Sequence, residues 1–201
     1  MMKTFSFALL LVSAGAAWAD PIDDTGYLIS CDDAGCMVAS SGFSLWLTPE
    51  SDPKAMAVLQ ALPAISAVSF AGDVANMSDA NADLTLTRAA HIDDVNEGNL
   101  QAMQGDWAPA KEDTPYFIRV VGLEWQEWAN NEMTASFAMT AGDACADGIT
   151  PGGGTVINLY RLGDDPDADG CWLLEGITQQ DMQMRDFQGQ AGQVMYRRVG
   201  P

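Results

Sequence analysis

The chain has 201 residues, with 28 Asp or Glu against nine Lys or Arg, and its formal net charge is −19. A surface this acidic repels phosphate backbones and anionic lipid headgroups, so we expect neither nucleic acid nor an anionic membrane as a partner. The charge favours cationic partners, or simply solubility in a salty medium. The length suits one large domain or two small ones, each with a hydrophobic core.

The first 19 residues have the pattern of a cleaved export signal. Lys3 supplies a positive start, residues 5–17 form a short apolar run, and Ala17-Trp18-Ala19 matches an A-x-A cleavage site. The apolar run is too short to span a bilayer and no later stretch is long enough, so we expect no membrane anchor. The sequence therefore predicts a signal peptide over residues 1–19 and a periplasmic or secreted protein.

Four cysteines follow the predicted signal, and an even number of cysteines in an oxidising compartment favours disulfide bonds. Cys31 and Cys36 flank a four-residue turn that can place them opposite each other in a hairpin. Cys145 and Cys171 would then form the second bridge, although other pairings stay open. Zinc is the alternative for four cysteines, but the chain has no C-x-x-C motif and a single histidine, His91.

Residues 20–95 mix strand and helix patterns, and we recognise no family motif in them. The expected strands cover residues 27–30, 36–39, 42–48, 64–70 and 83–87, and a short helix is expected over residues 51–62. Ser51 or Asp52 would cap this helix, Pro53 suits its first turn, and Pro63 ends it. We therefore expect a small mixed α/β region, followed by a connector over residues 91–104.

The region from residue 96 to 201 is predicted to be almost entirely β. About eight strands are expected, starting at Trp107 and continuing at residues 116–121, 123–128, 133–139, 155–161, 171–175, 180–187 and 193–199. The links are short, such as the hairpin turn Asn130-Asn131, and no helix intervenes. This pattern predicts an antiparallel up-and-down barrel or sandwich, so the whole chain is expected to be α+β and mostly β.

Gly105-Asp106-Trp107 at the start of this region and Arg197-Arg198 in its last strand resemble the Gly-x-Trp motif and C-terminal Arg of lipocalin-like (calycin) barrels. The resemblance covers about residues 99–199. It implies that Trp107 packs under Arg197 or Arg198 and plugs one end of the barrel.

The same resemblance implies a small apolar ligand inside the barrel. The side chains that would line its site are Phe117, Met133, Phe137, Met139, Met182 and Met184, and methionine adapts well to irregular ligands. The alternative is that a small barrel fills its interior with its own side chains.

The segment Gly163 to Cys171 contains the first half of a calcium-loop pattern. Asp165, Asp167 and Asp169, followed by Gly170, match the first four conserved positions of an EF-hand-type loop. The last position, which should be a bidentate Glu, is Gly176. We therefore weigh a calcium site against a solvated acidic turn, with the turn as the default, and expect no other cofactor.

Trp125 and Trp128 lie three residues apart in one predicted strand, so their side chains point to opposite faces. We expect one in the core and the other on the surface, where an exposed Trp is a common anchor for a protein partner.

His91 lies among acidic residues, but the chain has no G-x-S-x-G motif, and every cysteine is better placed in a disulfide. We therefore expect a non-enzymatic, exported binding or interaction protein, such as an inhibitor or accessory factor of another exported protein. Carriage of a small apolar ligand in the barrel and a hydrolase with an unrecognised site are the alternatives.

Overall fold

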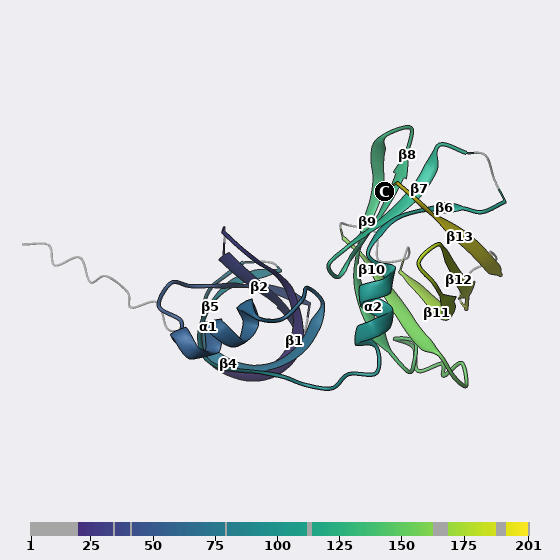
Figure 1. The fold of residues 1–201 in the computed structure, drawn as a ribbon. Helices are drawn as coiled ribbons and strands as arrows, with labels where there is room; N and C mark the ends of the chain where they lie inside the picture. The colour runs from purple at the N-terminus through teal and green to yellow at the C-terminus, as the bar shows by residue number, and fades with distance from the viewer. Residues whose placement is uncertain are drawn as a thin grey trace, which may run out of the picture.

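The computed structural model describes residues 20–33, 35–40, 42–78, 80–111, 114–162, 169–187 and 192–200. These residues are mostly in strands, and they form two closed β-barrels that follow each other along the chain (Figure 1). Each barrel has its own hydrophobic core. The predicted signal peptide, residues 1–19, lies outside the described residues. Among the helices that are described, none is long and apolar enough to cross a membrane.

The N-terminal barrel has the strand order β1-β2-β3-β5-β4 and closes between β4 and β1. Its elements are β1 (Asp20–Asp32), β2 (Gly35–Ser40), β3 (Phe43–Leu47), α1 (Pro53–Gln60), β4 (Ser66–Ser78) and β5 (Asn81–His91). β3 and β5 run parallel, and the other neighbouring strands are antiparallel. The expected mixed α/β region is thus corrected, because this half is also a barrel, with one short helix beside it.

Helix α1 begins where the sequence places it. Asp52 Oδ1 accepts hydrogen bonds from two backbone N–H groups of the first turn, and Pro53 occupies the first helical position, where no N–H is needed. Leu59 is fully buried in the core of the barrel. Ser51, the other candidate cap, accepts a hydrogen bond from the N–H of Leu86 at 2.9 Å and so joins the start of the helix to β5.

The C-terminal barrel is antiparallel and up-and-down, as predicted. Each strand pairs with the next along the chain, and the last pairs with the first. The strands are β6 (Gly105–Pro109), β7 (Tyr116–Val121), β8 (Glu124–Ala129), β9 (Glu132–Gly142), β10 (Thr155–Arg161), β11 (Gly170–Ile177), β12 (Asp181–Asp186) and β13 (Gln193–Val199). Asn130 and Asn131 have φ of 54° and 65°, the backbone that a tight two-residue hairpin turn requires.

Helix α2 (Glu97–Met103) lies between the two barrels in the chain, and its Leu100 and Met103 belong to the core of the C-terminal barrel. Ile65, which precedes β4, is fully buried in the same cluster. Tyr27 and Ile29 of β1 pack against this cluster as well. Side chains of the first barrel therefore extend the apolar core of the second.

Both predicted disulfides are present. Cys31 and Cys36 are directly paired residues of the β1–β2 hairpin, with their Cα atoms 4.0 Å apart. Cys145, in the loop after β9, is bonded to Cys171 of β11 with a Cα–Cα distance of 5.7 Å. Two disulfides are typical of proteins from oxidising compartments.

Candidate functional site

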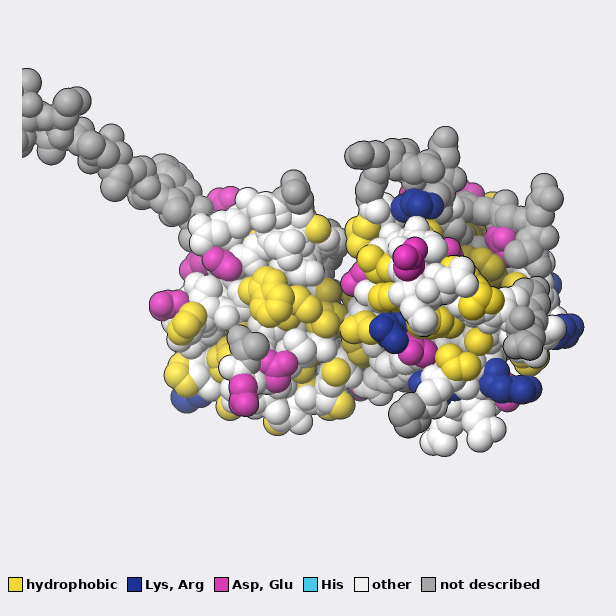
Figure 2. Space-filling model, turned by 90° about the horizontal axis from the view of Figure 1, so that it is seen from above, with side chains coloured by type: hydrophobic (Ala, Val, Ile, Leu, Met, Phe, Trp, Pro, Cys, Tyr) yellow, Lys and Arg dark blue, Asp and Glu magenta, His cyan; other side chains and the backbone are white. Residues whose placement is uncertain are grey.

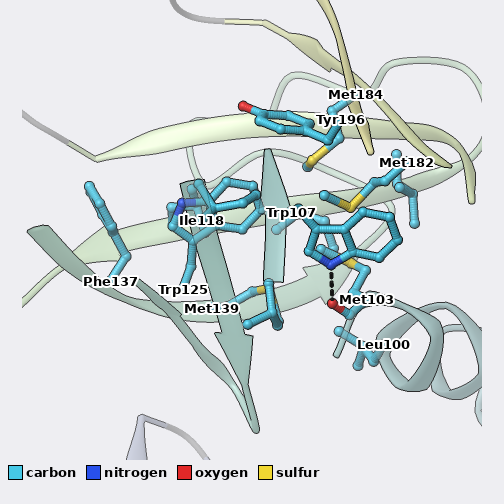
Figure 3. Close-up of a cluster of buried hydrophobic side chains, with 14 of the residues drawn as sticks. Leu100, Met103, Trp107, Ile118, Trp125, Phe137, Met139, Met182, Met184 and Tyr196 are labelled. Carbon is cyan, nitrogen blue, oxygen red and sulfur yellow. Dashed lines mark hydrogen bonds between the residues drawn. The ribbon is translucent and has the colours of Figure 1, made fainter. Parts of the chain in front are cut away.

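Trp107 contacts both helix α2 and Arg198 in the C-terminal barrel. Trp107 is fully buried, and its indole Nε1 donates a hydrogen bond to the Met103 carbonyl oxygen at 2.8 Å (Figure 3). The guanidinium carbon of Arg198 lies 4.2 Å from the Trp107 ring centroid, which is cation–π geometry. Its two terminal nitrogens donate to the carbonyl oxygens of Gln104 at 2.5 Å and Ala102 at 2.8 Å. Arg198 therefore covers the Trp and also satisfies carbonyl groups at the C-terminal end of α2.

The local geometry explains why a glycine stands two residues before this Trp. Gly105 has φ of 115°, and a Cβ there would lie only 2.5 Å from Arg198 Nη1. Arg197, the other candidate for this contact, points away and lies 3.8 Å from Asp181 with a side chain that is 67% exposed.

The middle of the C-terminal barrel is filled by its own side chains. Trp107, Met182 and Met184 are fully buried, and they pack in one cluster with Trp125 and Met139 (Figure 3). Of the predicted ligand-lining residues, four lie in this cluster: Phe137, Met139, Met182 and Met184. The remaining two do not. Met133, near the start of β9, is 52% exposed, and Phe117 lies on the outer face of β7.

The end of the barrel away from Trp107 contains a buried donor without an acceptor. Trp125 is 1% exposed, and its indole Nε1 has no hydrogen-bond partner in the described part of the chain. The Trp125 and Tyr196 rings meet edge to face, with centroids 6.4 Å apart. The Trp125 nitrogen and the Tyr196 hydroxyl both lie toward this end in Figure 3. An unpaired buried N–H of this kind costs about 1–3 kcal/mol, so an acceptor there would be stabilising.

Other polar groups lie at the same end of the barrel. The Tyr116 hydroxyl bonds to Glu127, and burial, followed by the charge of Glu127, raises the pKa of Tyr116 above its usual range. The guanidinium carbon of Arg161 lies 5.8 Å from the ring centroid of Phe137, its direct partner across β9–β10. The end of the barrel away from Trp107 therefore carries aromatic rings together with a carboxylate and a cation.

Four side chains form what we call the outer aromatic patch: Phe117, Arg119, Val121 and Trp128. Phe117 and Trp128 are direct partners across β7–β8, and their rings stack with centroids 5.9 Å apart and planes 9° apart. The guanidinium carbon of Arg119 lies 5.6 Å and 5.2 Å from the two centroids, and Val121 is 54% exposed. Alternation places these residues outside the barrel, since Ile118 and Val120 are buried in its core.

Arg119 is held in place by a bidentate ion pair with Asp106. Its Nε and Nη2 donate to the two carboxylate oxygens of Asp106 at 2.7 Å and 2.8 Å. These hydrogen bonds lower the pKa of Asp106 below its usual value. The patch is therefore preorganised, with its cation aligned over both aromatic rings.

Two residues of the predicted calcium loop, Asp165 and Asp167, lie outside the described residues. Asp169 is described, and its Oδ1 accepts a hydrogen bond at 2.8 Å from the N–H of Arg161, the last residue of β10. Within the described ranges, no group of three or more His, Cys, Asp or Glu side chains is arranged to hold a metal ion. His91 lies 3.1 Å from Glu97, which also accepts a hydrogen bond from the Ala67 N–H.

The polar groups at the end of the C-terminal barrel away from Trp107 were not predicted from the sequence, and neither was the role of Arg119. The alternation within β7 could have revealed Arg119, because apolar Ile118 and Val120 leave Phe117 and Arg119 together on the other face. The inward direction of Glu127 and Arg161 carries no such signal, because charged residues are rarely expected inside a barrel.

Comparison of the chain with protein-family models, curated proteins and solved structures finds no match.

Proposed function

We propose that the protein is an exported, non-enzymatic binding protein that contacts another exported protein through the outer aromatic patch. The contrast between the two sides of the C-terminal barrel carries this proposal. Inside, the space is taken by buried Trp and Met side chains, whereas outside, Phe117 and Trp128 are stacked in a patch that also contains the exposed Val121. The predicted signal and the two disulfides support export.

The composition of the patch suits protein recognition. Trp and Arg are the residues most often found at the energetic centre of interfaces. Asp106 already fixes the guanidinium of Arg119, and the stacked rings limit each other's motion, so little conformational entropy remains to be lost on binding. The net charge of −19 favours a basic partner and would speed its association. An inhibitor or accessory factor acts in this way, by binding alone.

We further propose that the C-terminal barrel is related to lipocalin-like barrels. The closed eight-stranded antiparallel barrel and the packing of Arg198 over Trp107 support this relation. It bears on shape alone, because one fold serves many unrelated functions.

The patch can be tested by comparing Trp128→Ala with Trp46→Ala, since Trp46 is a 43% exposed Trp on the other barrel. Tagged wild-type protein and both variants would be crosslinked in the periplasm, and the captured protein identified and purified for affinity measurement. We expect Trp128→Ala to weaken binding about thirtyfold, as for an interface hot spot, and Trp46→Ala to leave it unchanged. Equal affinity of all three proteins, with unchanged melting temperatures, would exclude the patch.

A second candidate function is capture of a small molecule beside Trp125, at the end of the C-terminal barrel away from Trp107. The unpaired Trp125 Nε1 favours it, because a ligand acceptor atom would complete that donor. Native mass spectrometry of protein purified from its own compartment would show a retained molecule, and Trp125→Phe would release it. Wild-type protein that carries nothing and shows no density of bound solute near Trp125 would remove this candidate.

A further inference from the structure

The N-terminal barrel has an apolar hollow of about 280 Å³ at one end. Its apolar lining consists of Pro21, Ile22, Phe43, Leu45, Val74, Met77 and Ala82. Leu45 and Ala82 are 3% exposed and form part of the barrel core, whereas Met77 is 59% exposed. The volume is near the lower end of the range for small-molecule sites, so the hollow suits a compact apolar group.

A carboxylate oriented by hydrogen bonds adjoins this apolar surface. Asp24 lines the hollow, and its Oδ2 lies 2.6 Å from the Ser40 hydroxyl, whose single proton it shares with the Thr25 carbonyl oxygen at 2.7 Å. Its Oδ1 accepts a second bond from the Thr25 N–H at 2.8 Å. Asp20 also lies in the lining but is exposed, so solvent and salt screen its charge more strongly. The hollow thus combines an apolar wall with a fixed negative charge.

The surrounding barrel strengthens this negative potential. Residues 20–91 contain ten carboxylates and two cationic side chains, Lys54 and Arg88. Neither cation lines the hollow, and Arg88 is paired with Asp23 at 2.9 Å. On the face seen in Figure 2, lysine and arginine lie mainly on the C-terminal lobe, whereas the N-terminal lobe shows hydrophobic and acidic side chains. A positively charged ligand is therefore drawn to this barrel.

We propose that the hollow binds a small organic cation, whose alkyl or aryl body enters the apolar space and whose ammonium group pairs with Asp24. Burial of the apolar body supplies most of the affinity, and the carboxylate selects the charge. An anion of the same shape is rejected by Asp24, and a neutral analogue loses the ion pair. This site is on the other barrel from the outer aromatic patch, so it is independent of the function proposed above.

Isothermal titration of the wild-type protein with a ligand series tests the proposal directly. The probes are n-octylammonium, n-hexylammonium, 1-octanol and octanoate. Each buried methylene strengthens binding about fourfold, so octylammonium should bind more than tenfold tighter than hexylammonium. Octanol should bind more weakly than octylammonium, and octanoate should not bind. Octanoate binding as tightly as octylammonium, or no octylammonium binding at millimolar concentration, would overturn the proposal.

Three variants locate the site. Asp24→Asn should weaken octylammonium binding about five- to tenfold and leave octanol binding unchanged. Asp73→Asn is the matched control, since Asp73 is an exposed carboxylate of the same barrel outside the lining, and it should bind like wild type. Ala82→Leu should weaken the binding of both alkylammonium probes and of octanol by filling the hollow. Equal octylammonium affinity of wild type and Asp24→Asn would refute the ion pair, and unchanged binding by Ala82→Leu would refute the location.

Discussion

Arg198 shows how one side chain can hold together parts of the chain that are far apart in sequence. It packs on Trp107 of the first strand of its barrel and donates hydrogen bonds to the carbonyl oxygens of Ala102 and Gln104 at the C-terminal end of α2. A third hydrogen bond, from its Nε, reaches the Gln179 carbonyl oxygen at 2.8 Å. Its neighbour Arg197 forms an exposed ion pair with Asp181 at 3.8 Å. Adjacent arginines therefore differ sharply in their expected contribution to stability.

We predict that Arg198→Ala lowers the free energy of unfolding by about 2–4 kcal/mol, because the cation–π contact is lost and carbonyl groups near Trp107 lose their donors. Arg197→Ala should cost less than about 0.5 kcal/mol, as expected for an exposed ion pair. Urea unfolding followed by tryptophan fluorescence measures both values. A similar cost for the two variants would contradict the assignment of Arg198 as the residue that covers Trp107.

Tyr116 should make the protein sensitive to alkaline pH. Burial, and then Glu127, raise its pKa in the folded state above the ordinary value of 10.0, so folding favours the neutral phenol. Its contribution to stability is therefore complete below about pH 10 and is lost as pH rises toward the folded pKa. We predict that Tyr116→Phe flattens the fall in unfolding free energy between pH 9.5 and pH 11, as measured by urea titration. Tyr160→Phe is the control, because Tyr160 is an exposed tyrosine of β10. Its unfolding free energy should fall with pH as steeply as that of wild type.

At the scale of elements, the two disulfides constrain loops of very different length. Cys31 and Cys36 are five residues apart within one hairpin, whereas Cys145 and Cys171 are 26 apart and join β11 to the loop after β9. In the chain-entropy model, removal of the longer bridge costs about 3–4 kcal/mol and removal of the shorter one about 2 kcal/mol.

We predict that the Cys145→Ala/Cys171→Ala variant melts at a lower temperature than the Cys31→Ala/Cys36→Ala variant. Differential scanning calorimetry under identical conditions gives the comparison. The larger loss should fall on the transition of the C-terminal barrel, because both cysteines of the longer bridge are buried against it. The reverse order would show that local packing, and not loop closure, dominates the effect of the bridges.

Strands with a clear period of two were predictable, and strands with acidic or mixed patterns were not. The β9 pattern, with Phe137 and Met139 buried, could be read directly from the sequence. β1 was expected only around residues 27–30, because Asp20, Asp23 and Asp24 do not resemble a strand, yet these residues pair with β4 along their length. The parallel pairing of β3 with β5 joins segments separated by a helix and another strand, and no local pattern encodes it.

The candidate sites also differ in whether a local sequence pattern could predict them. The outward position of Trp128 and the inward position of Trp125 follow from alternation in one strand. The hollow near Asp24 depends on barrel closure, which brings β1, β3, β4 and β5 to one end. Its residues are far apart in the sequence, so they could be recognised as a site only from the three-dimensional structure.

At the scale of the whole molecule, the two barrels are joined by apolar and polar contacts. Ile29 of β1 packs against the core cluster of the C-terminal barrel, and Gly122 of the β7–β8 turn lies next to it. Tyr27 donates a hydrogen bond to Asp94 of the connector at 2.8 Å. These contacts favour one relative orientation of the barrels over free rotation about the connector.

We predict that Ile29→Asp separates the motions of the two barrels and leaves each barrel folded. Rotational correlation times from ¹⁵N relaxation should become shorter and differ between the barrels, because a buried charge at the contact is strongly unfavourable. Val121→Asp, which alters an exposed residue of the outer face, is the control and should leave the tumbling unchanged. A single unchanged correlation time for Ile29→Asp would show that this contact does not fix the orientation.

The way each barrel closes also sets the order in which the two can fold as the chain is made. All strands of the first barrel lie within residues 20–91, so it can form while the rest of the chain is still being synthesised. The second barrel closes only when β13 pairs with β6, and only then can Arg198 pack over Trp107. Until then, β6 and β12 expose unpaired edges. The nascent second barrel is therefore the part of this protein that most needs protection from aggregation while the chain folds.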